Sequence, residues 1–282
     1  MKILVTGCCG FVGGAVSAWL EKQGEKVYCL DLENNCSSPR HLACDLTSAP
    51  GFELFPAKLD AVVHCAATMN RNLKPWEIMA VNTFSTYHLL ELGRKTGINK
   101  FVYLSTGGVY GYGEEPCREA SPALPTDPYS LSKYQGEILT GQFAEFFNTA
   151  SLRLFFPYGR GQKRGIFPLF IDKIKNRQPI TLNNQMGSPC TNPMAIRDLL
   201  AVIGLTLKSD KPSITLNAGG KEAVTIKQIA AMLGEKLHLP PVFEIQENPG
   251  VSNLLGDISG LKTHLGFVPQ ISLEQGLEEM LH

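Results

Sequence analysis

The chain has 282 residues, of which 44% are hydrophobic and 18% charged, and its 26 Lys and Arg residues balance its 26 Asp and Glu residues. This composition is typical of a globular protein that buries a large core in one large domain or two intertwined lobes. A neutral chain has no general field to hold nucleic acid or an anionic membrane, so any anion has to be bound at a local site. No apolar run reaches membrane-spanning length, and the N-terminus lacks the cleavage region of a signal peptide, so we expect a cytoplasmic protein.

The N-terminal segment has the order strand, glycine-rich turn, helix, strand. An apolar run over residues 3–6 is followed by Gly7, Gly10 and Gly13, then by a helical pattern over residues 15–23 and a strand over residues 26–31. Glycines at this spacing allow a tight turn, close approach of a pyrophosphate and close packing of helix on strand. The helix N-terminus then presents free N–H groups to the phosphates. The segment predicts a dinucleotide site.

Asp31, at the end of the second strand, bears on which dinucleotide binds. A carboxylate there accepts hydrogen bonds from the ribose hydroxyls and repels a 2′-phosphate. The next basic residue is Arg40. We therefore expect NAD rather than NADP, and a merely structural turn would not explain Asp31.

Strands and helices continue to alternate along the chain, which predicts a parallel sheet covered on both faces. We expect strands over residues 40–44, 60–65, 100–104, 150–156 and 212–217, and helices over residues 76–95, 129–148, 194–207 and 225–237. Ligands bind at the carboxyl ends of such strands. The residues that follow them are Asp45 and Leu46, expected beside the adenine, then Ala66 and Ala67, then Ser105 and Thr106. His64 is interpreted as a hydrogen-bonded core histidine rather than a catalyst.

Tyr129 and Lys133 are four residues apart at the start of a predicted helix, so they share one helix face. Thr126, Asp127 and Pro128 before them are typical of a helix start. A free phenol, with a pKa of about 10, is a poor base at neutral pH, and a nearby ammonium favours the phenolate. The pair is therefore a candidate acid/base for an alcohol or carbonyl. Alone, the motif is weak and a surface helix pair is the more common explanation, so the functional interpretation depends on the rest of the chain.

The composition of the chain changes from residue 157 onward, where glycine and basic residues become frequent. A glycine-rich loop contains Arg160, Lys163 and Arg164, and a predicted helix with three further basic residues follows. The loop is interpreted as a site for a second anion, such as a substrate diphosphate. For the helix, a solvated charged face is an equal alternative. Short helices are expected to close this lobe at the C-terminus.

Eight cysteines show no Cys-x-x-Cys spacing and several fall in predicted buried strands. They are interpreted as small buried hydrophobic residues in a reducing compartment. A zinc site formed by Cys36, His41 and Cys44 is conceivable but disfavoured, and we expect no metal.

Taken together, these residues resemble the extended short-chain dehydrogenase/reductase family, in particular its nucleotide-sugar epimerases and dehydratases, over nearly the whole chain. The resemblance rests on the motifs Thr6-Gly7-x-x-Gly10-x-x-Gly13, Asp31, Asp45, Ala66-Ala67, Asn82, Ser105-Thr106, Val109-Tyr110-Gly111, Tyr129-x-x-x-Lys133, Leu152-Arg153, Tyr158-Gly159, Asn217 and Leu265-Gly266-Phe267.

This resemblance implies an α/β fold with a Rossmann-type doubly wound parallel sheet and a smaller C-terminal substrate lobe. The NAD-binding domain is expected over residues 1–156 and 191–220, and the substrate lobe over residues 157–190 and 221–282. Relatives pair through the helices that match residues 76–95 and 129–148 as a four-helix bundle, so a C2 homodimer is expected, with Leu89, Leu92, Phe143 and Phe147 as apolar residues of those helices.

The resemblance also implies roles for single residues. Tyr129 would be the acid/base, Thr106 a hydrogen-bond partner of the reacting oxygen, and Lys133 a contact of the nicotinamide ribose. The expected cofactor-binding residues are Gly7, Gly10, Phe11, Val12, Gly13, Asp31, Asp45, Leu46, Ala66, Ala67, Asn82, Ser105, Tyr129, Lys133 and Phe156. The expected substrate-binding residues are Gly107, Gly108, Arg160 and Arg164.

Three departures from the family pattern restrict the activity. Family dehydratases have Asp-Glu directly after the catalytic threonine, where this chain has Gly107 and Gly108. Many members have Asn at the position of Phe156. Many also have an Arg and a His within the segment 190–198, which here reads Cys-Thr-Asn-Pro-Met-Ala-Ile-Arg-Asp, with Ala at position 195. The chain is also short for the family, so the substrate lobe is small.

Three hypotheses follow. The first is an NAD-dependent nucleotide-sugar epimerase or ketoreductase that acts by hydride transfer at a carbinol carbon and is not a dehydratase. The second, favoured by the departures at Phe156 and Ala195, is a reductase or dehydrogenase of a smaller carbonyl substrate. The third, a non-catalytic dinucleotide-binding regulator, would not need Thr106, Tyr129 and Lys133 together.

Overall fold

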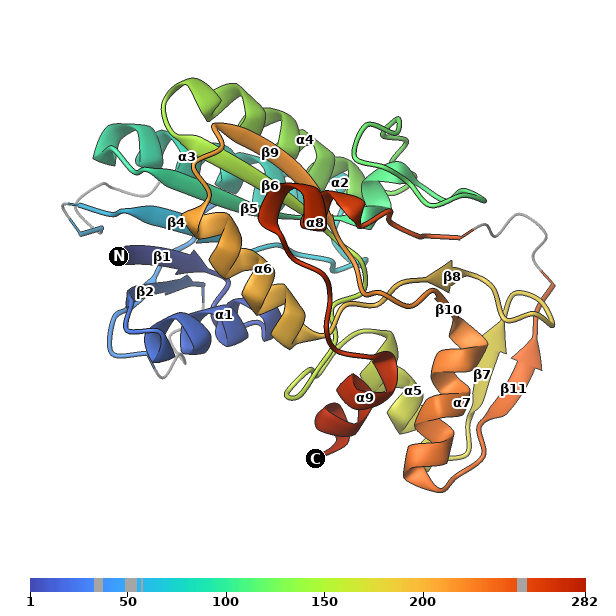
Figure 1. Ribbon diagram of the computed structural model, residues 1–282. Helices are drawn as coiled ribbons and strands as arrows, with labels where there is room; N and C mark the ends of the chain where they lie inside the picture. The colour runs from blue at the N-terminus through green and yellow to red at the C-terminus, as the bar shows by residue number, and fades with distance from the viewer. Residues whose placement is uncertain (33–37, 49–54, 57, 248–252) are drawn as a thin grey trace. The chain divides into compact units, whose positions relative to one another are not determined.

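The computed structural model describes residues 1–32, 38–48, 55–56, 58–247 and 253–282 (Figure 1). The chain divides into two compact units. The first unit comprises residues 1–109, 123–153 and 200–216, and the second comprises residues 110–122, 154–199 and 217–282. Which ligand each unit binds stays a prediction. Cys36, and with it the conceivable zinc site, lies outside the described residues.

A seven-stranded sheet with the order β3-β2-β1-β4-β5-β6-β9 forms the centre of the fold. Its strands are β1 (Lys2–Thr6), β2 (Lys26–Asp31), β3 (His41–Ala43), β4 (Ala61–His64), β5 (Lys100–Thr106), β6 (Asn148–Leu154) and β9 (Ser213–Ala218). The pairs β1–β2, β1–β4, β2–β3 and β4–β5 are parallel. The first six positions have the strand order of a doubly wound dinucleotide-binding sheet, and this confirms the predicted fold class.

Helices cover both faces of this sheet: in Figure 1, α3 and α4 lie on one side and α1 and α6 on the other. The helices of this part of the chain are α1 (Phe11–Lys22), α2 (Pro75–Met79), α3 (Ser85–Thr96), α4 (Pro128–Gln142) and α6 (Ile196–Lys208). A π-helical turn, Ala80–Phe84, joins α2 to α3 where a single long helix was expected. No helix within the described ranges is both long and apolar enough to cross a membrane.

Helix α4 begins as its sequence predicts and ends earlier than expected. The Asp127 side chain accepts a hydrogen bond from the Ser130 backbone N–H, and Pro128 occupies the first turn, where it has no N–H to lose. We expected the helix to reach residue 148, but it ends at Gln142 and a short 3₁₀ turn follows. Phe143 and Phe147 are buried there and pack with Phe101 in the core.

The second unit has its own apolar core, formed by residues such as Tyr158, Phe167, Ile180 and Leu233. Its helices are α5 (Ile166–Lys175), α7 (Ile226–Leu237), α8 (Ser259–Leu265) and α9 (Leu273–Leu281). Its strands form two small sheets that the sequence did not predict: β7 (Pro179–Leu182) pairs with β11 (Val242–Ile245), and β8 (Cys190–Thr191) pairs with β10 (Val224–Thr225). The short closing helices at the C-terminus are as expected.

Candidate active site

The glycine-rich loop between β1 and α1 leaves no space for side chains at two of its glycines. Gly7 has a φ of +70°, and a Cβ there would lie 2.8 Å from the backbone of Ala66. A Cβ at Gly13 would overlap with the Gly7 carbonyl group. The turn is closed by a hydrogen bond of 3.0 Å from the Gly10 N–H to the Gly7 carbonyl. Backbone therefore packs directly on backbone at the end of β1, as a dinucleotide-binding turn requires.

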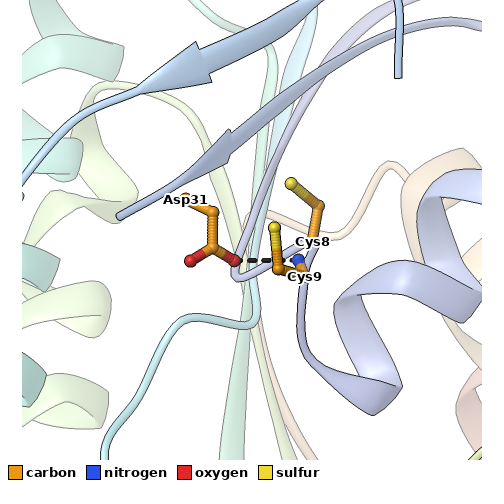
Figure 2. A group of neighbouring side chains, drawn as sticks. All are labelled: Cys8, Cys9 and Asp31. Atoms are coloured by element: carbon orange, nitrogen blue, oxygen red, sulfur yellow. Dashed lines mark hydrogen bonds between the residues drawn. The ribbon is translucent and has the colours of Figure 1, made fainter. Parts of the chain in front are cut away.

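Asp31 is held against this loop. Its Oδ2 accepts a hydrogen bond of 2.8 Å from the Cys9 backbone N–H, and its Oδ1 accepts one of 2.8 Å from the Leu32 N–H (Figure 2). The side chain is half-buried, so part of the carboxylate remains open. Its position beside the loop fits the expected contact with a ribose.

His64 is a core histidine, as predicted. It is fully buried, and its ring nitrogens pair with Thr6 Oγ1 at 2.7 Å and Thr86 Oγ1 at 3.0 Å. Burial, reinforced by the Lys133 charge, lowers the pKa of His64 well below its ordinary value. Thr6 Oγ1 also accepts a hydrogen bond from the Ala66 N–H. A neutral His64 therefore ties β1, β4 and α3 together beneath the loop.

Thr106, at the end of β5, lies near the first turn of α4. Its Oγ1 accepts a hydrogen bond of 3.1 Å from the Gly108 N–H, and a Cβ at Gly108 would lie 3.4 Å from Thr106 Oγ1 and 2.5 Å from Ser130 Oγ. Ser130 follows Tyr129 directly, and its hydroxyl is fixed by a 2.7 Å hydrogen bond to Asp127. The structure thus brings Thr106, Gly108 and the start of the Tyr129 helix together.

Lys133 is almost completely buried, with 1% of its surface exposed. Desolvation lowers its pKa to about 7, although nearby Cys65 and Glu137 oppose this shift. The ammonium lies 4.1 Å from the centre of the Tyr103 ring. A buried lysine with this pKa at the carboxyl edge of the sheet is typical of a functional site.

The pKa of Tyr129 differs from the sequence-based expectation. We expected Lys133 to favour the phenolate, but burial and, secondarily, Asp127 raise the pKa of Tyr129 to about 12. The expectation was wrong because it counted the charge of the lysine and not the desolvation of both groups. A neutral phenol is therefore the resting form at pH 7.

Asn82 lies in the π-helical turn and links two parts of the site. Its Oδ1 accepts a hydrogen bond from the Thr68 N–H at 2.7 Å, and its Nδ2 donates to the Thr68 carbonyl and, at 2.9 Å, to Ser132 Oγ. Ser132 in turn donates to the Tyr129 carbonyl. We expected Asn82 to contact the cofactor, but its fully buried amide favours positioning of α4, because a π-helical turn can aim a side chain that a regular helix would not.

A buried ion pair, which the sequence analysis missed, underlies the site. Arg153 on β6 donates to both carboxylate oxygens of Glu137, with distances of 2.6–3.1 Å. Ser105 Oγ lies 2.5 Å from Glu137 Oε1. Both charged side chains are less than a tenth exposed. Two signals were available: Glu137 follows Lys133 by four residues on the predicted helix, and Arg153 belongs to the Leu152-Arg153 motif. Neither indicated that the two charges pair.

The other expected cofactor residues of the first unit lie in the first turn of α1 or in the loops that follow β3 and β4. Phe11 and Val12 are half-buried in the first turn of α1. Asp45 is exposed and accepts two hydrogen bonds from Thr47, while Leu46 is buried and its carbonyl pairs with His88 Nδ1. Ala67 is exposed beyond β4.

Phe156, Arg160 and Arg164 belong to the second unit. Phe156 has a φ of 40°, in the left-handed region that favours glycine. Arg160 and Arg164 are exposed in the loop before α5. Their assignment to the cofactor and the substrate stays a prediction.

Comparison with known proteins agrees with this arrangement. The family model for the NAD dependent epimerase/dehydratase family matches residues 3–219. The chain is 25% identical over 304 residues to the dTDP-4-dehydro-6-deoxyglucose reductase of Escherichia coli, with 99% of this chain and 96% of the relative covered. It is 28% identical over 305 residues to a putative UDP-glucose 4-epimerase of Methanocaldococcus jannaschii, with 99% and 97% covered. Proteins named dTDP-D-glucose 4,6-dehydratase also match.

Among solved structures, MoeE5 in complex with UDP-glucuronic acid and NAD superposes with a TM-score of 0.90 at 25% identity, with 100% of this chain and 98% of that chain covered. The chain thus belongs to the NAD-dependent epimerase/dehydratase family, which confirms both the predicted family and NAD as the expected cofactor. The crowded glycine turn and the hydrogen-bonded Asp31 fit that cofactor.

Proposed function

We propose that this protein catalyses reversible oxidation and reduction at a carbinol carbon of a nucleotide sugar, as an epimerase or a ketoreductase. The observation that supports this most is the convergence of Thr106, Gly108 and the first turn of the Tyr129 helix, which carries a buried lysine with a pKa of about 7 one turn further on. Groups of this kind handle a proton on an oxygen while the adjacent carbon changes its oxidation state.

In this proposal, Tyr129 exchanges a proton with the substrate oxygen and Thr106 holds the same oxygen by a hydrogen bond. With a pKa of about 12, the Tyr129 phenol is ready to act as an acid when a ketone is reduced. In the opposite direction it must lose its proton, and a positive charge on Lys133 favours that loss. NAD, when bound, supplies the acceptor and donor of the hydride. Asp31 and the glycine-rich turn are expected to hold its adenosine and pyrophosphate portions.

Dehydration is disfavoured because the two positions after Thr106 lack the required acid and base. Elimination of water needs a proton donor for the leaving hydroxyl and a base for the adjacent C–H. Gly107 and Gly108 provide neither, and a Cβ at Gly108 would lie only 2.5 Å from Ser130 Oγ. An acidic side chain there would require Ser130 to move.

The names of the relatives support a nucleotide sugar as the substrate, since the solved neighbour binds UDP-glucuronic acid. The exposed Arg160 and Arg164 are proposed to contact its diphosphate. A smaller carbonyl substrate is the second candidate. It is favoured by two departures from the family pattern: Phe156, where many members have Asn, and the segment around Ala195, where many members have an Arg and a His.

We further propose a homodimer formed through α2, α3 and α4. The residues first considered for this contact, Leu89, Leu92, Phe143 and Phe147, are buried in the core of the subunit, so that part of the expectation was wrong. Other large apolar side chains of this region are exposed instead: Trp76, Phe84, Tyr87, Leu131, Ile138 and Phe146. Because α2 and α3 both pack on α4, apolar side chains exposed on these helices are suited to a two-fold contact.

A panel of UDP- and dTDP-sugars tests the function. An epimerase converts one 4-hydroxy sugar nucleotide into its epimer without net change in NADH absorbance, as followed by NMR. A ketoreductase consumes one NADH for each 4-keto sugar nucleotide that is reduced. Formation of a 4-keto-6-deoxy product would contradict the proposal. Turnover of small carbonyl compounds alone would favour the second candidate.

A further inference from the structure

The glycine-rich loop contains two adjacent thiols beside the carboxylate that faces it. Cys8 and Cys9 follow Gly7, and Asp31 ends the neighbouring strand β2. The Sγ atoms of both cysteines and a carboxylate oxygen of Asp31 all lie within 4.8 Å of one another. Figure 2 shows the two sulfurs on the same side of the loop, next to the Asp31 carboxylate. None of the chemistry proposed above uses either thiol.

Two thiolates and one carboxylate are a ligand set that suits zinc. Zn²⁺ binds cysteine sulfur at about 2.3 Å and carboxylate oxygen at about 2.0–2.2 Å, so a tetrahedral ion separates two sulfurs by about 3.8 Å. The ligand atoms lie up to 4.8 Å apart in the structure, about 1 Å farther than two sulfurs bound to one tetrahedral Zn²⁺ ion. Rotation of the side chains can close this difference.

The three ligand side chains differ in their exposure to solvent. Cys9 is exposed and Asp31 is half-buried, while Cys8, with 5% of its surface exposed, forms the inner end of the group. The Cys9 backbone N–H already donates to Asp31, so the loop and the carboxylate are held close before any ion arrives. Three protein ligands leave the fourth tetrahedral position to water.

We propose that Cys8, Cys9 and Asp31 bind a thiophilic divalent cation, Zn²⁺, and that this ion and NAD exclude each other. The exclusion rests on the proposed contact of Asp31 with the adenosine ribose. Each Asp31 oxygen already accepts a backbone N–H, so an ion at this carboxylate would take up the lone pair and the space that the ribose hydroxyls need. Linkage makes the effect reciprocal: Zn²⁺ weakens NAD binding by the same factor by which NAD weakens Zn²⁺ binding. Zn²⁺ is therefore expected to act as an inhibitor that competes with the cofactor.

Cobalt provides a direct probe, because Co²⁺ takes the place of Zn²⁺ and thiolate-bound Co²⁺ absorbs strongly in the near ultraviolet. Titration of the full-length, reduced protein with Co²⁺ should develop this absorption to one ion per chain, and Zn²⁺ should bleach it. Cys9→Ser and Cys8→Ser should each lower the affinity for Co²⁺ by at least about tenfold. Cys117→Ser, which changes a half-buried thiol of the second unit, is the matched control and should titrate like the unaltered protein.

NAD provides the second arm of the test. At a Zn²⁺ concentration that just saturates the unaltered protein, the apparent Kd of NAD should rise by about tenfold or more. The rise should be much smaller in Cys9→Ser at the same Zn²⁺ concentration, and the exposed Cys9 side chain can change without loss of folding. Co²⁺ absorption that persists in both cysteine variants would overturn the site, and unchanged NAD affinity at saturating Zn²⁺ would overturn the exclusion. Neither measurement uses a sugar substrate, so failure here is distinguishable from failure of the proposed reaction.

Discussion

The Lys133 ammonium lies 4.1 Å from the centre of the Tyr103 ring, while the Tyr103 hydroxyl donates a hydrogen bond of 3.3 Å to the Lys133 carbonyl. One aromatic side chain therefore supports the lysine at both its charged end and its backbone. The ring face attracts a cation, but its bulk also keeps water away. This contact helps to explain how Lys133 is buried on a helix whose first turn faces the site.

Lys133→Met should stabilise the protein without NAD, and the gain should depend on pH. The pKa of Lys133 falls from its ordinary value to about 7 on folding, because burial disfavours the ammonium. The unfolded chain therefore binds more protons than the folded one between pH 7 and about pH 10, so the lysine's unfavourable contribution is fully present below pH 7 and disappears as the pH rises toward 10.

Thermal melts at pH 6 and pH 9.5 measure this effect. Lys133→Met should melt several degrees above the unaltered protein at pH 6, and the difference should shrink at pH 9.5. Lys175→Met, on the last turn of α5, is a control on an exposed helix position and should show no such trend. A constant difference at both pH values would contradict the buried, titrating lysine.

Glu137→Gln should strongly destabilise the fold. The substitution keeps the shape of the side chain but leaves the buried Arg153 guanidinium without its carboxylate, which typically costs about 3–5 kcal/mol. Urea denaturation measures the loss. Glu91→Gln breaks the exposed ion pair with Arg94 and should leave the midpoint unchanged, as exposed pairs contribute little. Equal midpoints for the two variants would show that the buried pair is not needed.

Asp31→Ala should narrow the preference for NAD over NADP. The carboxylate repels a 2′-phosphate, so we expect NAD(H) to bind the unaltered protein at least about tenfold more tightly, or about 1.4 kcal/mol. Calorimetry with both dinucleotides measures the ratio. Similar affinities for the two before any substitution would contradict this role of Asp31.

Ile138→Lys and Phe84→Lys should separate the proposed dimer. Both side chains are exposed in the subunit, at 47% and 58%, so a charge there should spare the fold and disfavour only a two-fold apolar contact. Light scattering at micromolar concentration should give a dimer for the unaltered protein and monomers for the variants. Leu205→Lys, which changes an exposed apolar residue of α6, should remain dimeric. A monomeric unaltered protein would exclude the proposed contact.

The sequence predicted the main sheet well because its signals are local. Apolar runs such as residues 3–6 and the carboxylate at Asp31 each lie within a few residues of the turn they specify, and the glycines at positions 7 and 13 are required by direct backbone contact. The start of α4 was equally predictable, since Asp127 and Pro128 act within one turn.

The remaining features depend on contacts that are distant in the sequence. The Glu137–Arg153 pair joins a helix to a strand, and the pairing of β7 with β11 joins segments about sixty residues apart, so neither has a local signature. The π-helical turn at Asn82 serves a contact with Ser132 on another helix. The direction of the pKa shift of Tyr129 was missed for the same reason, because desolvation depends on the whole packed environment.

Turnover of Tyr129→Phe on the nucleotide sugar that the panel identifies tests the central claim most directly. The variant keeps the ring and removes only the titrating oxygen, so NAD should bind with near-normal affinity while turnover falls by roughly 10²–10⁴-fold, the usual scale for a lost general acid/base. Tyr134→Phe, on the same helix, is the matched control and should keep its activity. Full activity of Tyr129→Phe with normal NAD affinity would contradict the proposed chemistry.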